Sequence, residues 1–392
     1  MVILFAANNY FVNGKATQGF PIYLHRVTTS LAKFGHTPII VACGTENRHY
    51  VKEGVEIYII RCVPLEIAIK SIEEGYKVFY RSRKINRKIE EITREKAVDI
   101  IQFTSLQGLA VCYKEKIPAV MRLSSYAKVA YEVCQTFDER QIKIRAFFER
   151  MAAGRCHAIF APCQNTADAF SHDIGRKVSV IESPFVNDVA IYDESIYEKK
   201  LRDKKYVLYF GRMYAEKGIL VIADILQKFL ESNPEYYMVC CGQAENINGK
   251  SCVNILKEAS GNCRERFIYI EALPHEKLYP IIRRADFIIL PSFSENLSNA
   301  CIEAMYFERV VIGTDGASFE QLIEDGKSGL LCQRNDARSL LDKMNEAAAM
   351  TGEQKIEIGR QAKRRIDRLS PDLVVKKLIG YYRYIIHMYR KG

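Results

Sequence analysis

The sequence predicts an α/β protein with two domains, each built on a parallel sheet that helices cover on both faces. Short apolar runs alternate with longer amphipathic or charged stretches, which is the order of elements in a parallel sheet. This alternation stops once near the middle of the 392 residues and then begins again. The chain length also favours two or three domains, at roughly 150 residues for each domain.

The first half contains seven apolar runs that we expect to be buried strands. They are Val2–Ala7, Thr37–Ala42, Val55–Ile60, Ile100–Phe103, Ala119–Leu123, Ala158–Ala161 and Val178–Glu182. Helix-like patterns lie between several of them, such as Gly19–Phe34 and Ile142–Ala153. Because strands and helices alternate, the strands should run parallel with both faces of their sheet covered.

A polar, charge-rich stretch over Asn187–Lys205 is interpreted as the connection between the domains. A second series of strands then begins, at Tyr206–Phe210, Tyr237–Cys241, Phe267–Ile270, Phe287–Leu290, Val310–Gly313 and Gly329–Cys332. We expect helices at Ile219–Glu231 and, at the end of the chain, at Pro371–Arg390. Ligands of open parallel sheets bind beyond the carboxyl ends of the strands, so two facing sheets would form a cleft.

The composition is that of an ordinary globular protein, with 48% hydrophobic and 27% charged residues. It excludes wholesale disorder, a fibrous repeat and a multi-span membrane protein. The twelve cysteines stand in apolar stretches without C-x-x-C or zinc-site spacing, so we expect reduced, buried thiols. The N-terminus shows no signal peptide, and a cytoplasmic protein is expected. The net charge of +10 predicts an anionic partner without saying which.

The first candidate site follows the strand predicted at Tyr206–Phe210. The chain continues as Gly-Arg-Met-Tyr-Ala-Glu-Lys-Gly over residues 211–218 and then enters a helix. Gly211 lets the backbone turn, and Arg212 and Lys217 flank the loop. Arg can bind phosphate oxygens in pairs and Lys supplies a mobile charge, so the loop is a candidate phosphate site. Two solvated surface cations are the alternative.

A second candidate site follows the fourth strand of the second series. The chain runs Pro-Ser-Phe-Ser-Glu-Asn-Leu-Ser-Asn over residues 291–299 into a helix, with Ser298 or Asn299 as the expected N-cap. Glu295 stands before this helix and Glu303 lies inside it. Helix N-termini bind anions, and a carboxylate on each side can accept hydrogen bonds from sugar hydroxyls. A helix-surface acid is the alternative for Glu303, but its neighbours in sequence are apolar.

These two blocks resemble the signature of the retaining glycosyltransferases of family 4. The resemblance rests on Glu-x7-Glu from Glu295 to Glu303, with Pro-Ser before it and Ala-Met after it, and on Gly-Arg-x4-Lys-Gly from Gly211. Residues 310–316 (Val-Val-Ile-Gly-Thr-Asp-Gly) and 320–330 (Glu-Gln-Leu-Ile-Glu-Asp-Gly-Lys-Ser-Gly-Leu) are similar to further blocks of that family.

This family has the GT-B fold: two facing Rossmann-like parallel-sheet domains, with a C-terminal helix that crosses back to the first. On this resemblance we expect an acceptor-side domain over residues 1–186, joined by the returning helix 371–392. A donor-nucleotide-binding domain would then cover residues 187–370.

The N-terminal half resembles the family more loosely. The family's usual Gly-Gly near the first loop is Gln18-Gly19 here, so only Gly19 is carried over as a donor-binding residue. Many family members have a histidine in the loop after the strand equivalent to Ala119–Leu123, and this chain has none there. The side chains that we expect on the acceptor side instead are Arg122, Ser124, Ser125 and Tyr126.

The resemblance also implies a mechanism. Glu303 would bind the ribose hydroxyls and Glu295 would orient the transferred sugar, while Arg212 and Lys217 would neutralise the departing diphosphate. The remaining donor contacts would come from Gly211, Asn296, Leu297 and Ser298. Such catalysis is electrostatic and needs no protein nucleophile. No cofactor and no metal are expected, because the two cations do the work that a divalent ion does elsewhere.

Much of the positive charge lies in two segments. Lys70–Lys96 has nine Lys/Arg and five Asp/Glu, and Lys363–Gly392 has nine against two. The first segment alternates aromatic and basic residues, which suits an anionic membrane surface or acceptor. Solvated helix faces are the alternative. Peripheral attachment to the inner face of the cell membrane is therefore a hypothesis.

The function predicted is transfer of a sugar, with retention, from a nucleotide-diphosphate sugar to a glycan or lipid-linked acceptor. A UDP-sugar is favoured, and bacterial surface polysaccharide or glycolipid synthesis is the expected setting. Two alternatives stay open. A GT-B epimerase would convert a nucleotide sugar without an acceptor. A nucleic-acid-binding protein would use the basic segments, but no zinc-finger, RRM or KH signature supports it, and no nucleic-acid partner is expected.

Overall fold

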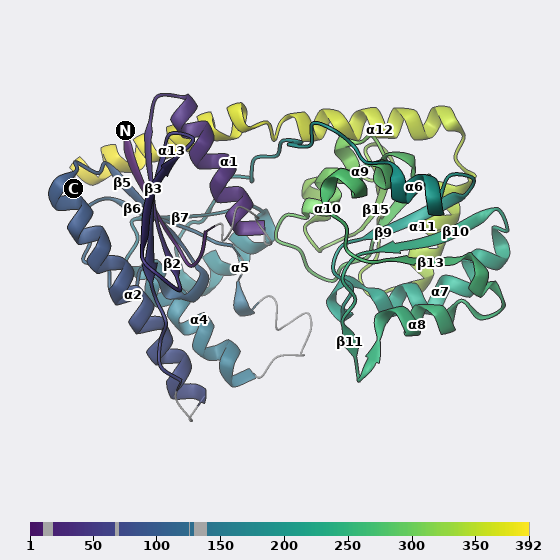
Figure 1. Cartoon of the computed structure of the whole chain (residues 1–392), viewed down its shortest axis with the longest axis horizontal. Coiled ribbons are helices and arrows are strands. Elements are labelled where there is room, and N and C mark those ends of the chain that lie inside the picture. Colours follow the sequence, from purple (N-terminus) through teal and green to yellow (C-terminus); the bar gives the residue numbers. More distant parts are fainter. Residues whose placement is uncertain (11–18, 67–69, 125, 129–138, 392) are drawn as a thin grey trace. The chain divides into compact units, whose positions relative to one another are not determined.

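The computed structural model describes residues 1–10, 19–66, 70–124, 126–128 and 139–391 (Figure 1). Its internal contacts divide the chain into two compact units. Unit 1 consists of Met1–Phe185 and Leu369–Gly392, and unit 2 of Val186–Arg368. Each unit contains a largely parallel sheet with helices on both faces, so the predicted fold class is confirmed.

Unit 1 is built on an eight-stranded sheet with the order β3-β4-β2-β1-β5-β6-β7-β8. The strands are β1 (Val2–Ala7), β2 (Thr37–Gly44), β3 (Arg48–Lys52), β4 (Val55–Arg61), β5 (Ile100–Thr104), β6 (Ala119–Arg122), β7 (Ala158–Ala161) and β8 (Ser179–Val180). Neighbouring strands pair in parallel except for β3, which runs antiparallel to β4 at the edge of the sheet. The sequence-based prediction omits β3, because this strand is charged and mostly exposed.

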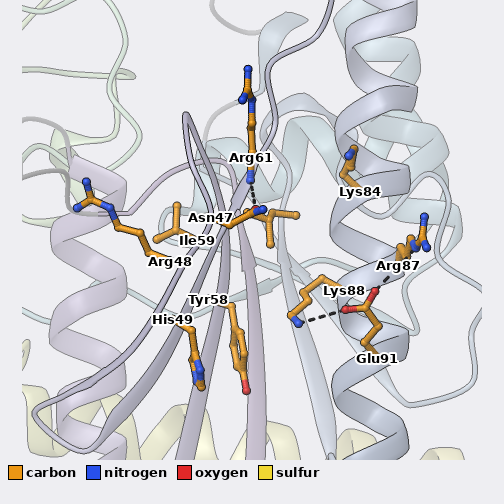
Figure 2. A pocket seen from close by; sticks show the side chains of 11 residues that line it. Asn47, Arg48, His49, Tyr58, Ile59, Arg61, Lys84, Arg87, Lys88 and Glu91 are labelled. Atoms are coloured by element: carbon orange, nitrogen blue, oxygen red, sulfur yellow. Dashed lines mark hydrogen bonds and ion pairs between the residues drawn. The ribbon is translucent and has the colours of Figure 1, made fainter.

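The helices of unit 1 lie on both faces of this sheet. They are α1 (Gly19–Lys33), α2 (Lys70–Glu95), α4 (Glu139–Gly154), α5 (Gln164–Ile174) and α13 (Pro371–Lys391). The long helix α2 runs beside the edge formed by β3 and β4 (Figure 2). Side chains alternate along β1: Ile3 and Phe5 pack with residues of α1 and α13, and Leu4 and Ala6 pack with residues of α2, α4 and α5.

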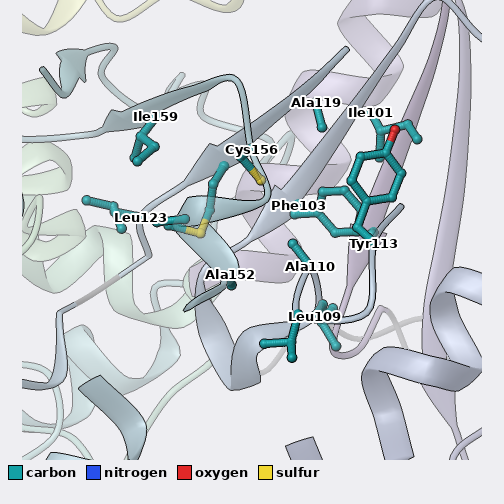
Figure 3. Packing of buried hydrophobic residues seen from close by; sticks show 14 of the residues in the cluster. Ile101, Phe103, Leu109, Ala110, Tyr113, Ala119, Leu123, Ala152, Cys156 and Ile159 are labelled. Atoms are coloured by element: carbon teal, nitrogen blue, oxygen red, sulfur yellow. The ribbon is translucent and has the colours of Figure 1, made fainter. Parts of the chain in front are cut away.

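Aromatic and aliphatic side chains fill the core on the second of these faces. Figure 3 shows Phe103 of β5 and Tyr113 of the following loop, which belong to the same cluster as Leu109 and as Ala119 of β6. The Phe103 and Tyr113 ring centroids are 5.1 Å apart. The acceptor-side residues that were predicted at Arg122 and Ser124 lie at the carboxyl end of β6, whose Ala119 and Met121 belong to this core.

The C-terminal helix α13 belongs to the second of the two chain segments that form unit 1, and it packs into the core of that unit. Its Tyr382 is fully buried and donates a hydrogen bond of 2.5 Å to Oε1 of Gln102 on β5. The chain leaves unit 1 after Phe185 and re-enters it at Leu369. The amide of Phe185 donates to the carbonyl of Leu369 at 2.8 Å, so the exit and the return lie side by side.

Unit 2 is built on a six-stranded parallel sheet with the order β13-β10-β9-β14-β15-β16. The strands are β9 (Lys205–Phe210), β10 (Tyr236–Cys241), β13 (Phe267–Ile270), β14 (Phe287–Leu290), β15 (Val310–Thr314) and β16 (Leu330–Cys332), and a small hairpin pairs β11 (Asn246–Ile247) with β12 (Lys250–Ser251). The two central strands, β9 and β14, are therefore neighbours in this sheet. Loops that follow them leave the same edge of the sheet.

The helices of unit 2 complete the layers. They are α6 (Ser195–Lys200), α7 (Ile219–Ser232), α8 (Cys252–Ala259), α9 (His275–Arg284), α10 (Asn299–Tyr306), α11 (Ala337–Ala349) and α12 (Gly352–Asp367). The polar stretch interpreted as the connection between the domains contains the short helix α6. Within the described ranges, no helix combines the length and the hydrophobicity that crossing a membrane requires.

Candidate functional site

The loop after β9 is the first part of the candidate site. Gly211 ends the strand, with its amide donating to the carbonyl of Cys241 at 3.0 Å. Residues 215–217 form one 3₁₀ turn, and Gly218 then begins α7 with a φ of +73°. A β-carbon at Gly218 would lie 2.1 Å from the carbonyl oxygen of Pro291, which comes directly after β14. Only glycine therefore lets these two loops approach so closely.

The loop after β14 is the second part. Ser298 caps α10: its side-chain oxygen accepts a hydrogen bond of 3.3 Å from the amide of Cys301. The predicted N-cap is confirmed, with Ser298 rather than Asn299 in that role. Asn296 and Leu297 lie in the turn before it. Within the part of the chain that the structure describes, the amides of Leu297 and Ser298 donate no hydrogen bond to the protein, so both are available to an anion.

The two loops are joined by an ion pair. Nζ of Lys217 contacts Oε1 of Glu295, and these side chains are only 22% and 15% exposed. The amide of Phe293 also donates to the carbonyl of Glu216 at 2.8 Å. Burial alone would lower the pKa of Lys217, but the effects of Glu295 and Tyr214 together outweigh it, so the pKa lies above its usual value. Lys217 is therefore a largely buried side chain that stays protonated and positively charged.

Arg212 is the more exposed of the two predicted cations. Its guanidinium forms an ion pair with Glu245 at 2.5 Å, and this hydrogen bond raises the pKa of Arg212 further. The Tyr214 ring lies close to both cations, 5.1 Å from the Arg212 guanidinium carbon and 5.9 Å from Nζ of Lys217. Sequence analysis singled out neither Tyr214 nor Glu245. Glu245 follows the carboxyl end of β10, the neighbour of β9, and the strand-end rule alone would have marked it.

Glu303 lies on α10, with its side chain 11% exposed. The imidazole Nε2 of His275 is 3.5 Å from Oε1 of Glu303, and the His275 ring stacks on Tyr279 at a centroid distance of 4.9 Å. His275 begins α9, which precedes β14 in the chain. The sequence motif around α10 does not predict that His275 contacts Glu303, because this contact depends on how α9 packs against α10.

The predicted acceptor-side residues lie in unit 1. Arg122 is buried at the end of β6 and donates to Ser124 Oγ at 3.1 Å and to Ser183 Oγ at 2.9 Å. Its guanidinium carbon is 3.8 Å from the Tyr23 ring centroid, and burial lowers its pKa. The phenol of Tyr126 donates to Asp173, so it is already bound within the protein. Ser125 lies outside the described residues.

The predicted site residues thus fall into two groups. The loops after β9 and β14 bring Gly211, Arg212, Lys217, Glu295 and the start of α10 to one edge of the unit 2 sheet, with Glu303 in the helix that follows. Gly19 begins α1 in unit 1 and is exposed. Of the unit 1 residues, Arg122 and Ser124 are hydrogen-bonded to each other.

Two family models match the chain and together cover most of it. Residues 17–185 match Glycosyltransferase Family 4, and residues 193–365 match Glycosyl transferases group 1. The chain belongs to glycosyltransferase family 4, which has the GT-B fold.

Similar proteins of known function are distant. The D-inositol 3-phosphate glycosyltransferase of Corynebacterium urealyticum is 24% identical over 48% of this chain and 45% of its own length. The GDP-mannose:cellobiosyl-diphosphopolyprenol alpha-mannosyltransferase of Xanthomonas oryzae is 22% identical over 54% of each chain. These alignments span about half the length of the curated relatives. A D-inositol 3-phosphate glycosyltransferase of Pseudarthrobacter chlorophenolicus matches over 88% of this chain and 85% of its own, at 23% identity.

Solved structures match over nearly the whole chain. Sucrose-phosphate synthase from Thermosynechococcus elongatus has a TM-score of 0.77 at 15% identity, covering 99% of both chains. HepE of Anabaena, solved in complex with UDP and glucose, has a TM-score of 0.71 at 14% identity, covering 98% of this chain and 100% of its own. At these identities the likeness establishes the fold.

Proposed function

We propose that this protein transfers a sugar, with retention of configuration, from a nucleotide-diphosphate sugar to an acceptor. The observation that carries the proposal is the pairing of Lys217 with Glu295 between two loops that Gly218 holds in contact with Pro291. A cation fixed at this point is preorganised to meet the charge that develops on a departing diphosphate. Membership of family 4 supports retention and a nucleotide-sugar donor.

In this proposal each side chain has one task. Lys217 exchanges its contact with Glu295 for the phosphate oxygens, and Arg212 binds them from the exposed side. The carboxylate of Glu295 is then released to accept hydrogen bonds from the transferred sugar, since an ionised carboxylate is an acceptor only. Glu303 binds the ribose hydroxyls, and the amides of Leu297 and Ser298 add to the anion site at the start of α10. Because these groups carry the charge compensation, we expect transfer to proceed without a metal.

A thermal-shift panel tests the donor site. UDP, GDP, ADP and CMP are compared on the wild type, on Glu303→Ala and on Glu231→Ala, a control at the exposed end of α7. We expect UDP to raise the melting temperature of the wild type and the control and to lose most of this effect on Glu303→Ala. If GDP rather than UDP raises the melting temperature, the donor is a GDP-sugar. The name of the Xanthomonas relative gives GDP-mannose as the donor of that protein. If none of the nucleotides stabilises the wild type, the donor-site assignment is wrong.

Product analysis tests the reaction. The enzyme is incubated with the donor found in the panel, with and without candidate glycan and lipid-linked acceptors, and the anomeric configuration of the product is read by NMR. We expect transfer only with an acceptor, with the donor's configuration kept. Conversion of the nucleotide sugar without any acceptor would instead support the epimerase alternative.

We also propose that unit 1 attaches to an anionic membrane surface, which would suit a lipid-linked acceptor in surface polysaccharide or glycolipid synthesis. Helix α2 combines cationic residues with Phe79, which is 47% exposed, and Phe147 of α4 is 50% exposed. Both rings contact Phe148, so they belong to one apolar patch. Exposed aromatic rings beside cations are the features that hold helices at membrane surfaces.

Co-sedimentation with vesicles tests this attachment. We expect the wild type to pellet with vesicles that contain phosphatidylglycerol and far less with phosphatidylcholine alone. The double variant Phe79→Ser/Phe147→Ser should pellet less, while the control Leu373→Ser/Met388→Ser, which removes two exposed apolar side chains of α13, should behave as the wild type. Equal pelleting with neutral and anionic vesicles would exclude an electrostatic membrane site.

A further inference from the structure

A basic pocket lies at the edge of the unit 1 sheet, between β3, β4 and α2. Its volume is about 610 Å³, within the range of roughly 300–1,000 Å³ that is usual for small-molecule sites. The wall on the sheet side comes from residues 47–49 and 58–61, and the wall on the helix side from Lys84, Arg87, Lys88 and Glu91. Figure 2 shows the side chains of both walls.

The lining carries five cationic side chains and one carboxylate. The cations are Arg48, Arg61, Lys84, Arg87 and Lys88, and the carboxylate is Glu91. Lys88 and Arg87 share Glu91, at 3.1 and 3.8 Å. Arg48 pairs with Glu46 outside the lining. Among the described residues, Arg61 and Lys84 have no carboxylate partner. The pocket therefore holds an excess of positive charge that the protein itself leaves unneutralised.

Glu56 of β4 does not correct this imbalance. Glu56 is next to the pocket but contacts Nζ of Lys96, and it accepts hydrogen bonds from the Tyr58 phenol at 2.6 Å and from His49 at 3.1 Å. The His49 and Tyr58 rings are stacked, with centroids 4.1 Å apart, and Nζ of Lys88 is 4.9 Å from the Tyr58 ring centroid. The stacked rings of His49 and Tyr58 therefore form an aromatic part of the pocket lining.

We propose that this basic pocket binds the phosphate groups of a phosphorylated ligand. Guanidinium groups recognise phosphate oxygens in pairs, and two lysines add mobile charge from the helix side. The ligand is either a free phosphorylated small molecule or the phosphate headgroup of a lipid, which share this chemistry. The pocket lies in unit 1, whereas the candidate diphosphate site after β9 and β14 lies in unit 2. The inference therefore does not depend on the donor site, although a lipid headgroup bound here would contribute to the membrane attachment proposed for unit 1.

The test compares one pocket variant with one matched control in the full-length protein. Arg61→Gln/Lys84→Gln removes two exposed cations of the pocket, and Lys116→Gln/Lys177→Gln removes two exposed cations elsewhere in unit 1. Both variants keep Arg212 and Lys217, so any binding of phosphate at the unit 2 site is common to them. Since all four positions are exposed, both variants should unfold at the wild-type temperature, which thermal melting checks.

Two arms identify the source of the phosphate. Isothermal titration with pyrophosphate probes a free ligand, and co-sedimentation with vesicles of phosphatidylcholine, with and without phosphatidylglycerol, probes a headgroup. Weakening of pyrophosphate binding by about tenfold in the pocket variant alone supports the pocket with a free ligand. Selective loss of anionic-vesicle binding in that variant supports it with a headgroup. If the pocket variant and the control match in both arms, the proposal is overturned.

Discussion

Lys217 links the parts of the candidate site, because it contacts Glu295 of the other loop and lies near the Tyr214 ring. The motif marked Lys217 and Glu295 from sequence, since both are part of recurring patterns. The motifs could not identify Tyr214 or His275 as neighbours of the charged groups. These contacts depend on how the chain folds and do not correspond to a fixed spacing in the sequence.

Replacing Lys217 tests its electrostatic task. We expect Lys217→Ala to lower kcat by about 10²–10³, the range seen when one preorganised charge-stabilising group is lost. The exposed Lys327, paired with Glu324, gives the control variant Lys327→Ala, whose kcat should stay at the wild-type level. Steady-state kinetics with the donor from the thermal-shift panel make the comparison. Equal kcat values for the two variants would contradict the assigned role.

Glu149 of α4 predicts a pH dependence of stability in unit 1. The residue is 6% exposed, and burial raises the pKa of its carboxyl to about 8 against the opposing effects of the Ala127 amide, Arg145 and Arg150. The folded protein therefore holds a proton that the unfolded chain releases near pH 4.5. The resulting stabilisation is complete below pH 4.5 and is lost as the pH rises to about 8. Over this interval the free energy of unfolding falls by roughly 5 kcal/mol because of this group.

The variant Glu149→Gln separates this titration from the others. A neutral glutamine can still accept the hydrogen bond from the Ala127 amide, which is 3.3 Å long. We expect the variant to melt at a higher temperature than the wild type at pH 9 and at nearly the same temperature at pH 5. Melting curves across this interval measure the difference. A constant offset at all pH values would show that Glu149 does not titrate in it.

At the scale of elements, the contact between the loops after β9 and β14 depends on Gly218. We expect Gly218→Ala to destabilise unit 2 by more than about 2 kcal/mol. The alanine would have to adopt a positive φ, and its β-carbon would lie 2.1 Å from the Pro291 carbonyl oxygen. Gly249→Ala is the control: its φ is +80°, but its β-carbon would meet no atom within 4 Å. Urea unfolding should show the larger loss for Gly218→Ala. Equal losses would mean that the close approach adds nothing.

The elements show where sequence analysis succeeds and where it fails. Buried strands such as β1 and β14 consist of apolar residues only, so the apolar runs in the sequence predicted them directly. The last helix, predicted at Pro371–Arg390, is observed at Pro371–Lys391. The edge strand β3 was missed because its register comes from pairing with β4 rather than from its own apolar pattern. Helix α6 was missed because its six residues are too few to show a periodicity.

At the scale of the molecule, unit 1 requires both of its segments. Helix α13 contributes Val375, Leu378 and Tyr382 to the core on one face of the sheet. We expect a chain that ends at Ser370 to lose hydrogen-exchange protection in β1, β2 and β5, while β9 and β14 of unit 2 remain protected. Mass spectrometry of exchanged peptides measures both units in one experiment. Unchanged protection in unit 1 would show that α13 is dispensable.

The fold class was predictable at this scale because it depends on the order of elements, which the chain displays twice. The basic pocket was not: Arg61 and Lys84 are 23 positions apart, and only the packing of α2 beside β4 places them in one lining. The sequence showed the charge of residues 70–96 without showing that Glu73 and Glu91 pair with cations of this segment, whereas Glu90 pairs with Lys114 outside it.

The hydrogen bond between Phe185 and Leu369 places the departure and the return of the chain at a single point of unit 1. Unit 2 is thus an uninterrupted insertion in a host whose ends already meet. Its gene segment can be exchanged as a cassette between related enzymes with only two junctions to repair. A protease that cuts one of the two crossings leaves unit 2 covalently joined to one of the two segments of unit 1. After a cut at the first crossing, the packing of α13 in the unit 1 core still holds the two fragments together.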